Sequence, residues 1–264
     1  MAFARINGVV LHFRVEGPEN APALVLVNSL GTDARIWDEV IARFSARYRV
    51  ISYDKRGHGL SAAPDGDYRL DDHVDDLCGL LECLGIGRLA LAGVSVGGMI
   101  AQGFALRHAD RLAALILCDT AAKIGDAQMW NERIATVRDK GLVAIAEPVM
   151  ARWFTERFRR EQAVELEGWR NMLLRTPVGG YAGTCAALRD ADLRGPVASI
   201  AAPTLVIVGE QDLSTPVQLV SGMAQTIAGA QFAVIPDCGH IPSIEQPQAL
   251  ADLMTHFLKE VGYD

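Results

Sequence analysis

The sequence predicts an α/β fold in which a mostly parallel β-sheet is covered by helices on both faces. Short apolar runs typical of buried strands alternate with longer segments of helical periodicity. The chain has 264 residues, of which 50% are hydrophobic and 22% charged. A chain of this size and composition can bury a large core without a disulfide or a structural metal.

The expected strands are apolar runs bounded by turn residues, at 9–15, 23–27, 49–53, 88–92, 113–118, 203–208 and 231–235. We expect the first of them to be an antiparallel edge strand. The expected helices begin after capping or turn residues, and several end at glycine, at 37–46, 70–84, 96–108, 215–227 and 247–261. The order of these elements predicts a doubly wound sheet.

Between Thr120 and Pro196 the alternation of strands and helices stops. Helical stretches are expected there at 126–140, 142–154, 156–174 and 181–188, with no convincing strand. The segment is too long for a structureless loop, which favours a helical insertion over the sheet against ordinary crossover helices. We therefore expect residues 1–121 to form the first part of the core, 122–196 a helical cap, and 197–264 the second part of the core.

The charge balance argues against nucleic acid as a partner. Lys and Arg number 25 against 32 Asp and Glu, a net charge of −7, and the basic residues of 157–160 alternate with glutamates as on a solvated helix face. We also expect no membrane partner, because no signal peptide or lipid-facing span can be recognised. The five cysteines form no CxxC pair, which favours reduced thiols and a cytoplasmic location. The sequence does not define the oligomeric state, and a homo-oligomer is compatible with it.

The strongest motif is Gly93-Val94-Ser95-Val96-Gly97, between an apolar strand and a helix. A serine on such a tight strand–turn–helix junction is typical of a nucleophile, because glycines relieve the crowding and the hydroxyl is pushed out of the sheet. The helix amides would then face a developing oxyanion. The alternative is a glycine-rich packing turn. We favour the nucleophile because of the strand and the helix on either side.

A serine hydroxyl needs a base, and His240 is the histidine on a loop after the last expected strand. His58, in a glycine-rich turn, is a weaker candidate. The base needs an acid to hold its tautomer, and Asp212 follows the preceding strand directly. Asp119 also follows a strand and is the rival, although Asp212 is better placed to meet the base from behind.

The turn 28–33 follows an early strand and is the expected source of a second oxyanion donor. The backbone N–H groups of Leu30 and Val96 would then bind the negative charge. A polar loop without this role is the alternative. We interpret the turn 54–61 as structural. No cluster of metal ligands is evident, and the chemistry implied by these residues needs no metal or organic cofactor.

With these residues the chain resembles the α/β-hydrolase superfamily over its whole length, and more closely the 3-oxoadipate enol-lactonases. The order Ser95, Asp212, His240 is that of the superfamily. The resemblance rests on segments 28–32, 93–102 and 118–125, and on 152–155 and 180–193 inside the insertion. Many members of the superfamily have His-Gly at the early oxyanion turn, where this chain has Asn28-Ser29.

The resemblance implies hydrolysis of 3-oxoadipate enol-lactone through an acyl-enzyme, in bacterial breakdown of aromatic acids through protocatechuate or catechol. The alternatives within the fold are a general carboxylesterase, a C–C bond hydrolase and a cofactor-free haloperoxidase or perhydrolase. A non-catalytic ligand receptor is the alternative from another class, because fold does not determine function. Turnover with burst kinetics, as opposed to stoichiometric binding, distinguishes an enzyme from a receptor.

The implied substrate is a small anionic lactone, so a local cation must oppose the negative net charge. The candidates lie beside aromatic residues of the insertion: Arg133 near Trp130, and Arg189 near Tyr181, with Lys123 at its start. A planar arginine fork matches a carboxylate best. Trp130, Met129 and Trp153 would form the apolar wall. Solvated surface charges and ordinary core packing are the alternative explanations for these residues.

Overall fold

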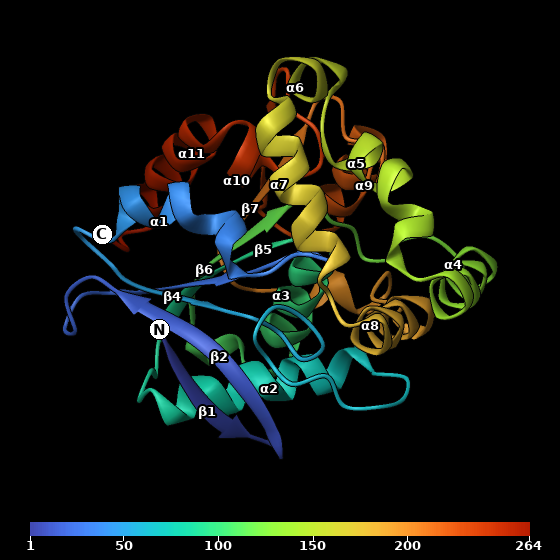
Figure 1. The fold of residues 1–264 in the computed structure, drawn as a ribbon. Helices are drawn as coiled ribbons and strands as arrows, with labels where there is room; N and C mark the ends of the chain where they lie inside the picture. The colour runs from blue at the N-terminus through green and yellow to red at the C-terminus, as the bar shows by residue number, and fades with distance from the viewer.

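A computed structural model describes residues 1–264 and confirms the α/β fold (Figure 1). Its 8-stranded sheet has the order β1-β2-β4-β3-β5-β6-β7-β8. The strands β3 to β8 run parallel to one another, and β2 pairs antiparallel with both β1 and β4. Every residue of β3, β5, β6 and β7 is buried, as expected for central strands covered on both faces.

The bounds of the elements follow the chain. The strands are β1 Ala2–Ile6, β2 Val9–Glu16, β3 Ala23–Val27, β4 Arg49–Tyr53, β5 Leu89–Val94, β6 Leu112–Cys118, β7 Thr204–Gly209 and β8 Gln231–Ile235. The α-helices are α1 Asp38–Phe44, α2 Leu70–Cys83, α3 Val96–Arg107, α4 Ala127–Lys140, α5 Ala146–Trp153, α6 Glu156–Glu161, α7 Ala163–Leu174, α8 Val178–Asp190, α9 Val217–Thr226, α10 Pro242–Glu245 and α11 Pro247–Glu260. Short 3₁₀ helices are η1 Ala34–Trp37, η2 Ala109–Arg111, η3 Leu142–Ile145 and η4 Pro196–Ser199.

The sequence-based expectation for the sheet edge was wrong. The strand β2 is antiparallel, but it lies between β4 and β1, and β1 is the edge strand. The two strands are joined by Asn7 and Gly8, both with positive φ. Asn-Gly is a strong signal for a two-residue hairpin turn, because both positions of that turn need the left-handed conformation. The missed strand therefore had a recognisable mark in the sequence.

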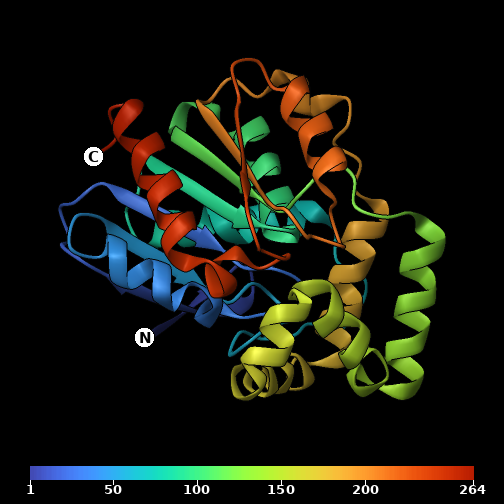
Figure 2. The ribbon, with the colours of Figure 1, turned by 90° about the horizontal axis from the view of Figure 1, so that it is seen from above.

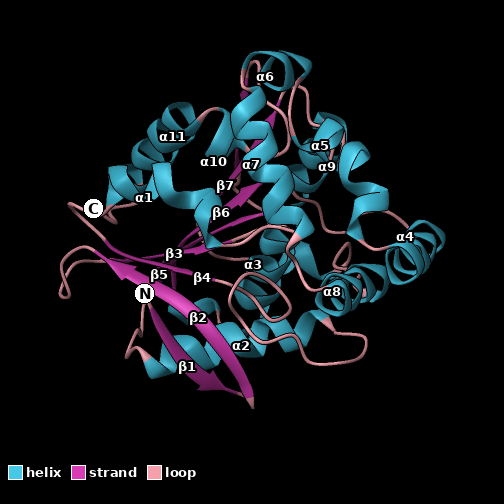
Figure 3. Cartoon of the chain, in the orientation of Figure 1, coloured by secondary structure: helices cyan, strands magenta, loops and turns pink.

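Helices cover the sheet on both faces (Figure 3). In Figure 1, α1 and α11 lie above the sheet and α2 and α3 below it. The helix α3 packs on β5 and β6, α2 packs on α3, and α9 packs on β7 and β8. This arrangement brings the carboxyl ends of the parallel strands to one edge, where loops can gather functional side chains.

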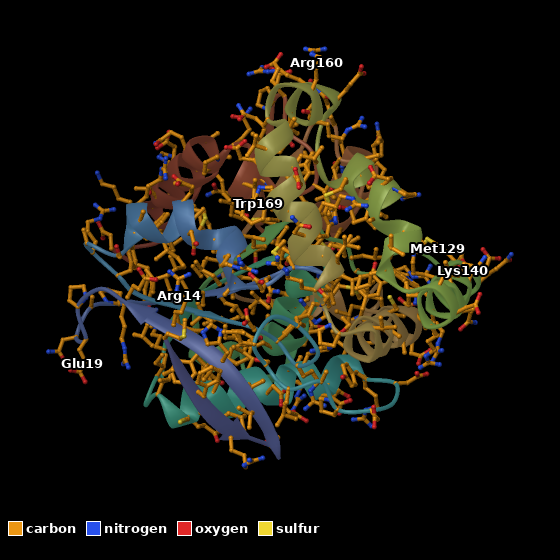
Figure 4. All side chains as sticks on the ribbon, viewed as in Figure 1. Arg14, Glu19, Met129, Lys140, Arg160 and Trp169 are labelled. Carbon is orange, nitrogen blue, oxygen red and sulfur yellow. The ribbon has the colours of Figure 1, made fainter.

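Between β6 and β7 the chain forms helices only, as the sequence predicts. Figure 2 shows the green-to-gold helices α4 to α8 gathered beside one end of the sheet. The expected helix 156–174 is in fact two, because Gln162 leaves the helical conformation between α6 and α7. In Figure 4, Arg160 and Lys140 lie on the outer surface of this segment. The domain boundaries at 121 and 196 stay a prediction.

The core of the sheet continues into the helical segment. One cluster of buried apolar side chains includes strand residues such as Leu91 and Ile116 together with Trp130, Leu173 and Tyr181 from the helical segment. The helical segment is therefore packed on the sheet and shares its apolar core. All five cysteines are free thiols. No helix combines the length and the apolar character that crossing a membrane requires.

Candidate active site

Ser95 lies on the sharp turn between β5 and α3, with φ +59° and ψ −121°. This backbone conformation is strained for a residue with a side chain, and such strain is concentrated at functional sites. The flanking glycines are required by space: a Cβ on Gly93 would lie 2.2 Å from the Gly97 carbonyl oxygen, and one on Gly97 2.3 Å from that of Val27. The turn therefore forms only with glycine on both sides of the serine.

His240 lies on the loop between β8 and α10 and is buried. Its Nδ1 is 2.8 Å from Oδ2 of Asp212, which lies after β7. The backbone N–H of His240 donates to the carbonyl oxygen of Trp153 at 2.9 Å, so the helical segment also holds this loop. The Asp212 contact fixes the orientation of the imidazole and leaves Nε2 for another partner.

Asp212 and its rival Asp119 both reach this histidine. Carboxylate oxygens of the two aspartates and a ring nitrogen of His240 lie within 4.8 Å of one another, and this is the one grouping of metal-ligand type in the chain. Burial and the charge of Asp212 raise the pKa of Asp119 well above its ordinary value. Burial opposes ionisation of Asp212 as well, but His240 and the hydrogen bonds from Thr215 and Ser214 hold its pKa below the ordinary value.

Hydrogen bonding explains the difference between the two carboxyl groups. Oδ1 of Asp212 accepts from the N–H groups of Ser214 (2.7 Å) and Thr215 (3.1 Å), and Oδ2 from the hydroxyl of Thr215 (2.6 Å). Asp119 accepts one hydrogen bond, from Gly209 N–H at 2.8 Å, and its Oδ2 has no partner. The negative charge is therefore more stable on Asp212.

Ser95 and His240 line one small cavity of about 100 Å³. Its walls come from two parts of the chain. The sheet and its loops contribute Ser29, Leu30, Ser95, Ser214 and His240, whereas the helical segment contributes Ile124, Gly125, Met129, Trp130, Arg133, Val149, Arg152, Trp153, Tyr181 and Leu188. The structure thus brings together the expected nucleophile, base, oxyanion loop and apolar wall.

The cations of the helical segment separate into two groups. Arg133 lines the cavity, donates to the hydroxyl of Tyr181 at 3.2 Å and forms no ion pair. Arg152 also lines it, and its only hydrogen bond is a long one of 3.4 Å to the Leu213 carbonyl oxygen. The sequence analysis did not propose Arg152. Like Arg133, it lies close to a tryptophan in the sequence, so the same signal could have found it. Both guanidinium groups remain available to an anionic ligand.

Arg189 and Lys123 do not line this cavity. Arg189 forms ion pairs with Asp67 (3.1 Å) and Asp190 (2.8 Å), so its charge is already compensated. Lys123 donates to the carbonyl oxygens of Leu188, Arg189 and Ala191 at the end of α8. Neither cation is therefore placed to anchor a ligand beside Ser95.

The backbone donors expected for an oxyanion are also placed at the cavity. Val96 is the first residue of α3, so its backbone N–H has no acceptor within the helix. Leu30 lines the cavity, and its N–H makes no hydrogen bond within the chain.

A larger hollow of about 510 Å³, between η1 and helices α6, α7 and α10, is lined by several acidic residues and contains neither Ser95 nor His240.

Comparison with known proteins gives the class first. Residues 22–247 match the family model of the alpha/beta hydrolase fold. The chain therefore belongs to the α/β-hydrolase family.

Its relatives narrow this further. The chain is 39% identical to 3-oxoadipate enol-lactonase 2 of Acinetobacter baylyi over 91% of this chain and 90% of the relative. The crystal structure of the enol-lactonase from Burkholderia xenovorans LB400 superposes with a TM-score of 0.95 at 40% identity, covering 98% of this chain and all of that one. A thermophilic esterase from Thermogutta terrifontis, solved with malate bound, has a TM-score of 0.94 at 32% identity, covering 99% of both chains. Within its family the chain groups with the 3-oxoadipate enol-lactonases and is a carboxylic ester hydrolase.

Proposed function

We propose that the protein hydrolyses 3-oxoadipate enol-lactone to 3-oxoadipate, in the degradation of aromatic acids through protocatechuate or catechol. The observation that carries this proposal is the cavity itself, where Ser95 and His240 face two arginines without carboxylate partners. A small site with an apolar wall and guanidinium groups that have no carboxylate partner suits a compact lactone that bears a carboxylate. The similarity to the Acinetobacter and Burkholderia enol-lactonases supports the same substrate.

The proposed reaction is acyl transfer to Ser95. His240 takes the serine proton as Oγ bonds to the lactone carbonyl carbon, and the amides of Leu30 and Val96 bind the oxyanion. When the carbonyl re-forms, the bond to the ring oxygen breaks and the ring oxygen leaves as an enolate. The proton that His240 took from Ser95 passes to this enolate, which becomes the ketone, and His240 is neutral again. Water that gives a proton to His240 then attacks the acyl-enzyme and releases Ser95. Asp212 holds the tautomer of His240 and stabilises its charged form.

Residues 122–196 act in this proposal as a cap that supplies substrate specificity. Arg133 and Arg152 anchor the carboxylate, and Trp130 and Trp153 contact the apolar side of the ring. The related esterase from Thermogutta terrifontis was solved with malate bound, so a protein of similar fold binds a small carboxylate. The substrate carboxylate therefore adds to binding energy without entering the bond-breaking step.

The test is to follow the loss of ultraviolet absorbance of the enol-lactone with the purified protein, beside hydrolysis of uncharged aryl esters. We expect Arg133→Met and Arg152→Met each to raise KM for the lactone by about tenfold or more and to change aryl ester hydrolysis little. Arg138→Met is the matched control, because Arg138 is on the same helix as Arg133 and pairs with Asp67 on the surface. Ser95→Ala should abolish both activities.

Two results would contradict the proposal. A wild-type protein that hydrolyses aryl esters but leaves the lactone intact is a general esterase. Equal effects of the two arginine variants on the lactone and on the neutral esters would show that these residues do not recognise a carboxylate.

A further inference from the structure

The peptide between Ser29 and Leu30 is held from one side only. Its carbonyl oxygen accepts hydrogen bonds from the Thr32 hydroxyl at 3.0 Å and from Nζ of Lys55. Two longer contacts come from the Thr32 N–H at 3.4 Å and from Nδ2 of Asn28 at 3.5 Å. The N–H of the same peptide, which belongs to Leu30, has no partner in the chain. The peptide is trans, so its C=O and N–H point in opposite directions. Donors that hold the carbonyl therefore also determine where the Leu30 N–H points.

Lys55 is an unusual residue for this position. It follows β4 in the turn 54–61, and only 1% of its surface is exposed. A buried ammonium group is costly unless acceptors replace the lost water, and burial lowers the pKa of Lys55 well below its ordinary value. The carboxylates of Asp54 and Asp33 oppose this lowering. The one hydrogen bond of its Nζ is to the Ser29 carbonyl oxygen, so this peptide is the only group that the lysine donates to.

The same turn holds the next peptide of the loop as well. The N–H of Gly31 donates to Nε2 of His58 at 3.0 Å, and Nδ1 of this ring lies 3.2 Å from the Arg56 carbonyl oxygen. The ring must accept at Nε2, so its proton is on Nδ1 and the histidine is neutral. His58 is fully buried, and burial lowers its pKa. Lys55 therefore holds the peptide before Leu30 through its carbonyl oxygen, and His58 holds the peptide after Leu30 through its N–H.

We propose that Lys55 is a positioning residue for the oxyanion site, one that orients the Leu30 N–H and polarises the peptide to which it belongs. The inference rests on the proposed acyl transfer by Ser95. As the bond from Oγ to the carbonyl carbon forms, the π-electron pair moves to the carbonyl oxygen and the serine proton passes to His240. A side-chain donor on the Ser29 carbonyl oxygen polarises the peptide and makes the Leu30 N–H a stronger donor to that oxygen. Because this effect grows as charge develops, it lowers the barrier more than it strengthens substrate binding.

The test is Lys55→Met, which keeps the length of the side chain and removes its donor. Acylation by p-nitrophenyl acetate is followed in single turnovers, with active sites counted from the burst of p-nitrophenol. We expect the acylation rate constant to fall by about 30-fold or more, with the dissociation constant of the ester changed less than about twofold. The affinity for phenyl trifluoromethyl ketone, which adds the serine Oγ to give a tetrahedral oxyanion, should fall by a similar factor.

Lys123→Met is the matched control, because this lysine also donates only to backbone carbonyl oxygens but lies outside the cavity. Its acylation rate constant should equal that of the wild type. If Lys55→Met does not fold, Thr32→Val removes another donor to the same carbonyl oxygen and should slow acylation by about threefold to tenfold.

An acylation rate constant within about threefold of the wild-type value in Lys55→Met, together with unchanged ketone affinity, would overturn the inference. In the absence of folded Lys55→Met, a wild-type rate in Thr32→Val would do the same. The probe is a simple ester, so this test does not depend on the natural substrate. Failure of the wild type to open the enol-lactone would refute the lactonase proposal and leave the role of Lys55 to be decided by these measurements.

Discussion

Two carboxyl groups lie next to the imidazole of His240, and the hydrogen bonds around them separate their roles. Asp212 accepts three hydrogen bonds from Ser214 and Thr215 in addition to its contact with His240. Asp119 accepts one, and its second oxygen is buried without a partner. Carboxylate oxygens of the two aspartates lie within 4.8 Å of each other, so two buried negative charges there would repel. The carboxyl group with fewer hydrogen-bond donors is the one that keeps its proton. Asp119 is therefore the neutral member of the pair.

Changing each aspartate to asparagine should separate them clearly. We expect Asp212→Asn to reduce kcat by several orders of magnitude, because an amide would favour the wrong tautomer of His240. Asp119→Asn should have a mild effect, because an amide resembles a neutral carboxyl group and can still accept from Gly209 N–H. Steady-state kinetics on an aryl ester measures both. The reversed pattern would assign the acid to Asp119.

Asp119 should also influence the pH dependence of stability. Its folded-state pKa is raised, so the folded protein binds a proton that the unfolded chain releases above about pH 4. Its contribution to stability is thus complete below the unfolded pKa and is lost as the pH rises toward the folded pKa. Asp119→Asn does not titrate, so its free energy of unfolding relative to the wild type should increase with pH, by at most about 1.4 kcal/mol per unit. Urea unfolding between pH 4 and 8 measures this difference, and a difference independent of pH would show that Asp119 is ionised when folded.

At the scale of elements, the helix α8 packs against the turn that carries Lys55 and His58. A Cβ on Gly180 would lie 2.2 Å from the Gly57 carbonyl oxygen, and one on Gly57 2.6 Å from the Cα of Gly180. Both groups that would clash are backbone, so neither can rotate away. Gly179, one residue earlier in α8, has no atom within 4 Å of its added Cβ. The close approach of helix and turn therefore depends on Gly180.

Alanine at these two positions should act in opposite directions. We expect Gly180→Ala to lower the free energy of unfolding by about 1–3 kcal/mol, because the helix must move away from the turn. Gly179→Ala should be neutral or raise it by up to about 1 kcal/mol, because alanine favours a helix. Urea denaturation of the two variants decides the matter. Equal stabilities would mean that α8 does not rest on the turn as described.

At the scale of the whole molecule, Glu245 connects the helical segment to the histidine loop. Its carboxylate accepts hydrogen bonds from Gly239 N–H at 3.0 Å, from Thr155 N–H at 3.3 Å and from the Thr155 hydroxyl. The carbonyl oxygen of Trp153 receives the N–H of His240 beside this contact. Residues about 90 positions apart in the chain thus share one anchor next to the base.

Removing the Glu245 carboxylate should make both the histidine loop and the segment around Thr155 open more often. We expect Glu245→Ala to increase hydrogen exchange at the amides of Thr155 and Gly239 and to destabilise the protein by about 1–3 kcal/mol. The control is Glu210→Ala, because Glu210 accepts one hydrogen bond of 3.3 Å from the exposed Asp237 of the same loop. Similar exchange in the two variants would show that Glu245 does not hold the segments together.

Several features follow from the sequence alone because they depend on local geometry or on chain order. The strand–turn–helix around Ser95 is recognisable because only glycine fits on both sides of the serine. Asp212 and His240 are recognisable because each follows a strand, and parallel strands end at the same edge of the sheet. The helical segment between β6 and β7 was predicted from its length and periodicity. The hairpin turn at Asn7-Gly8 was equally local, and β1 could have been predicted from it.

The tertiary structure decided the questions that depend on partners distant in the chain. Arg189 is neutralised by Asp67 and Arg133 is not, although both lie beside aromatic residues in the sequence. The turn 54–61 looked structural, and it is the fold that places Lys55 against Ser29. The state of a charged or polar group depends on which acceptors, donors and solvent surround it. Those neighbours come from other elements, so only the assembled sheet and helices determine which cations stay free and which amide of the oxyanion loop is held in place.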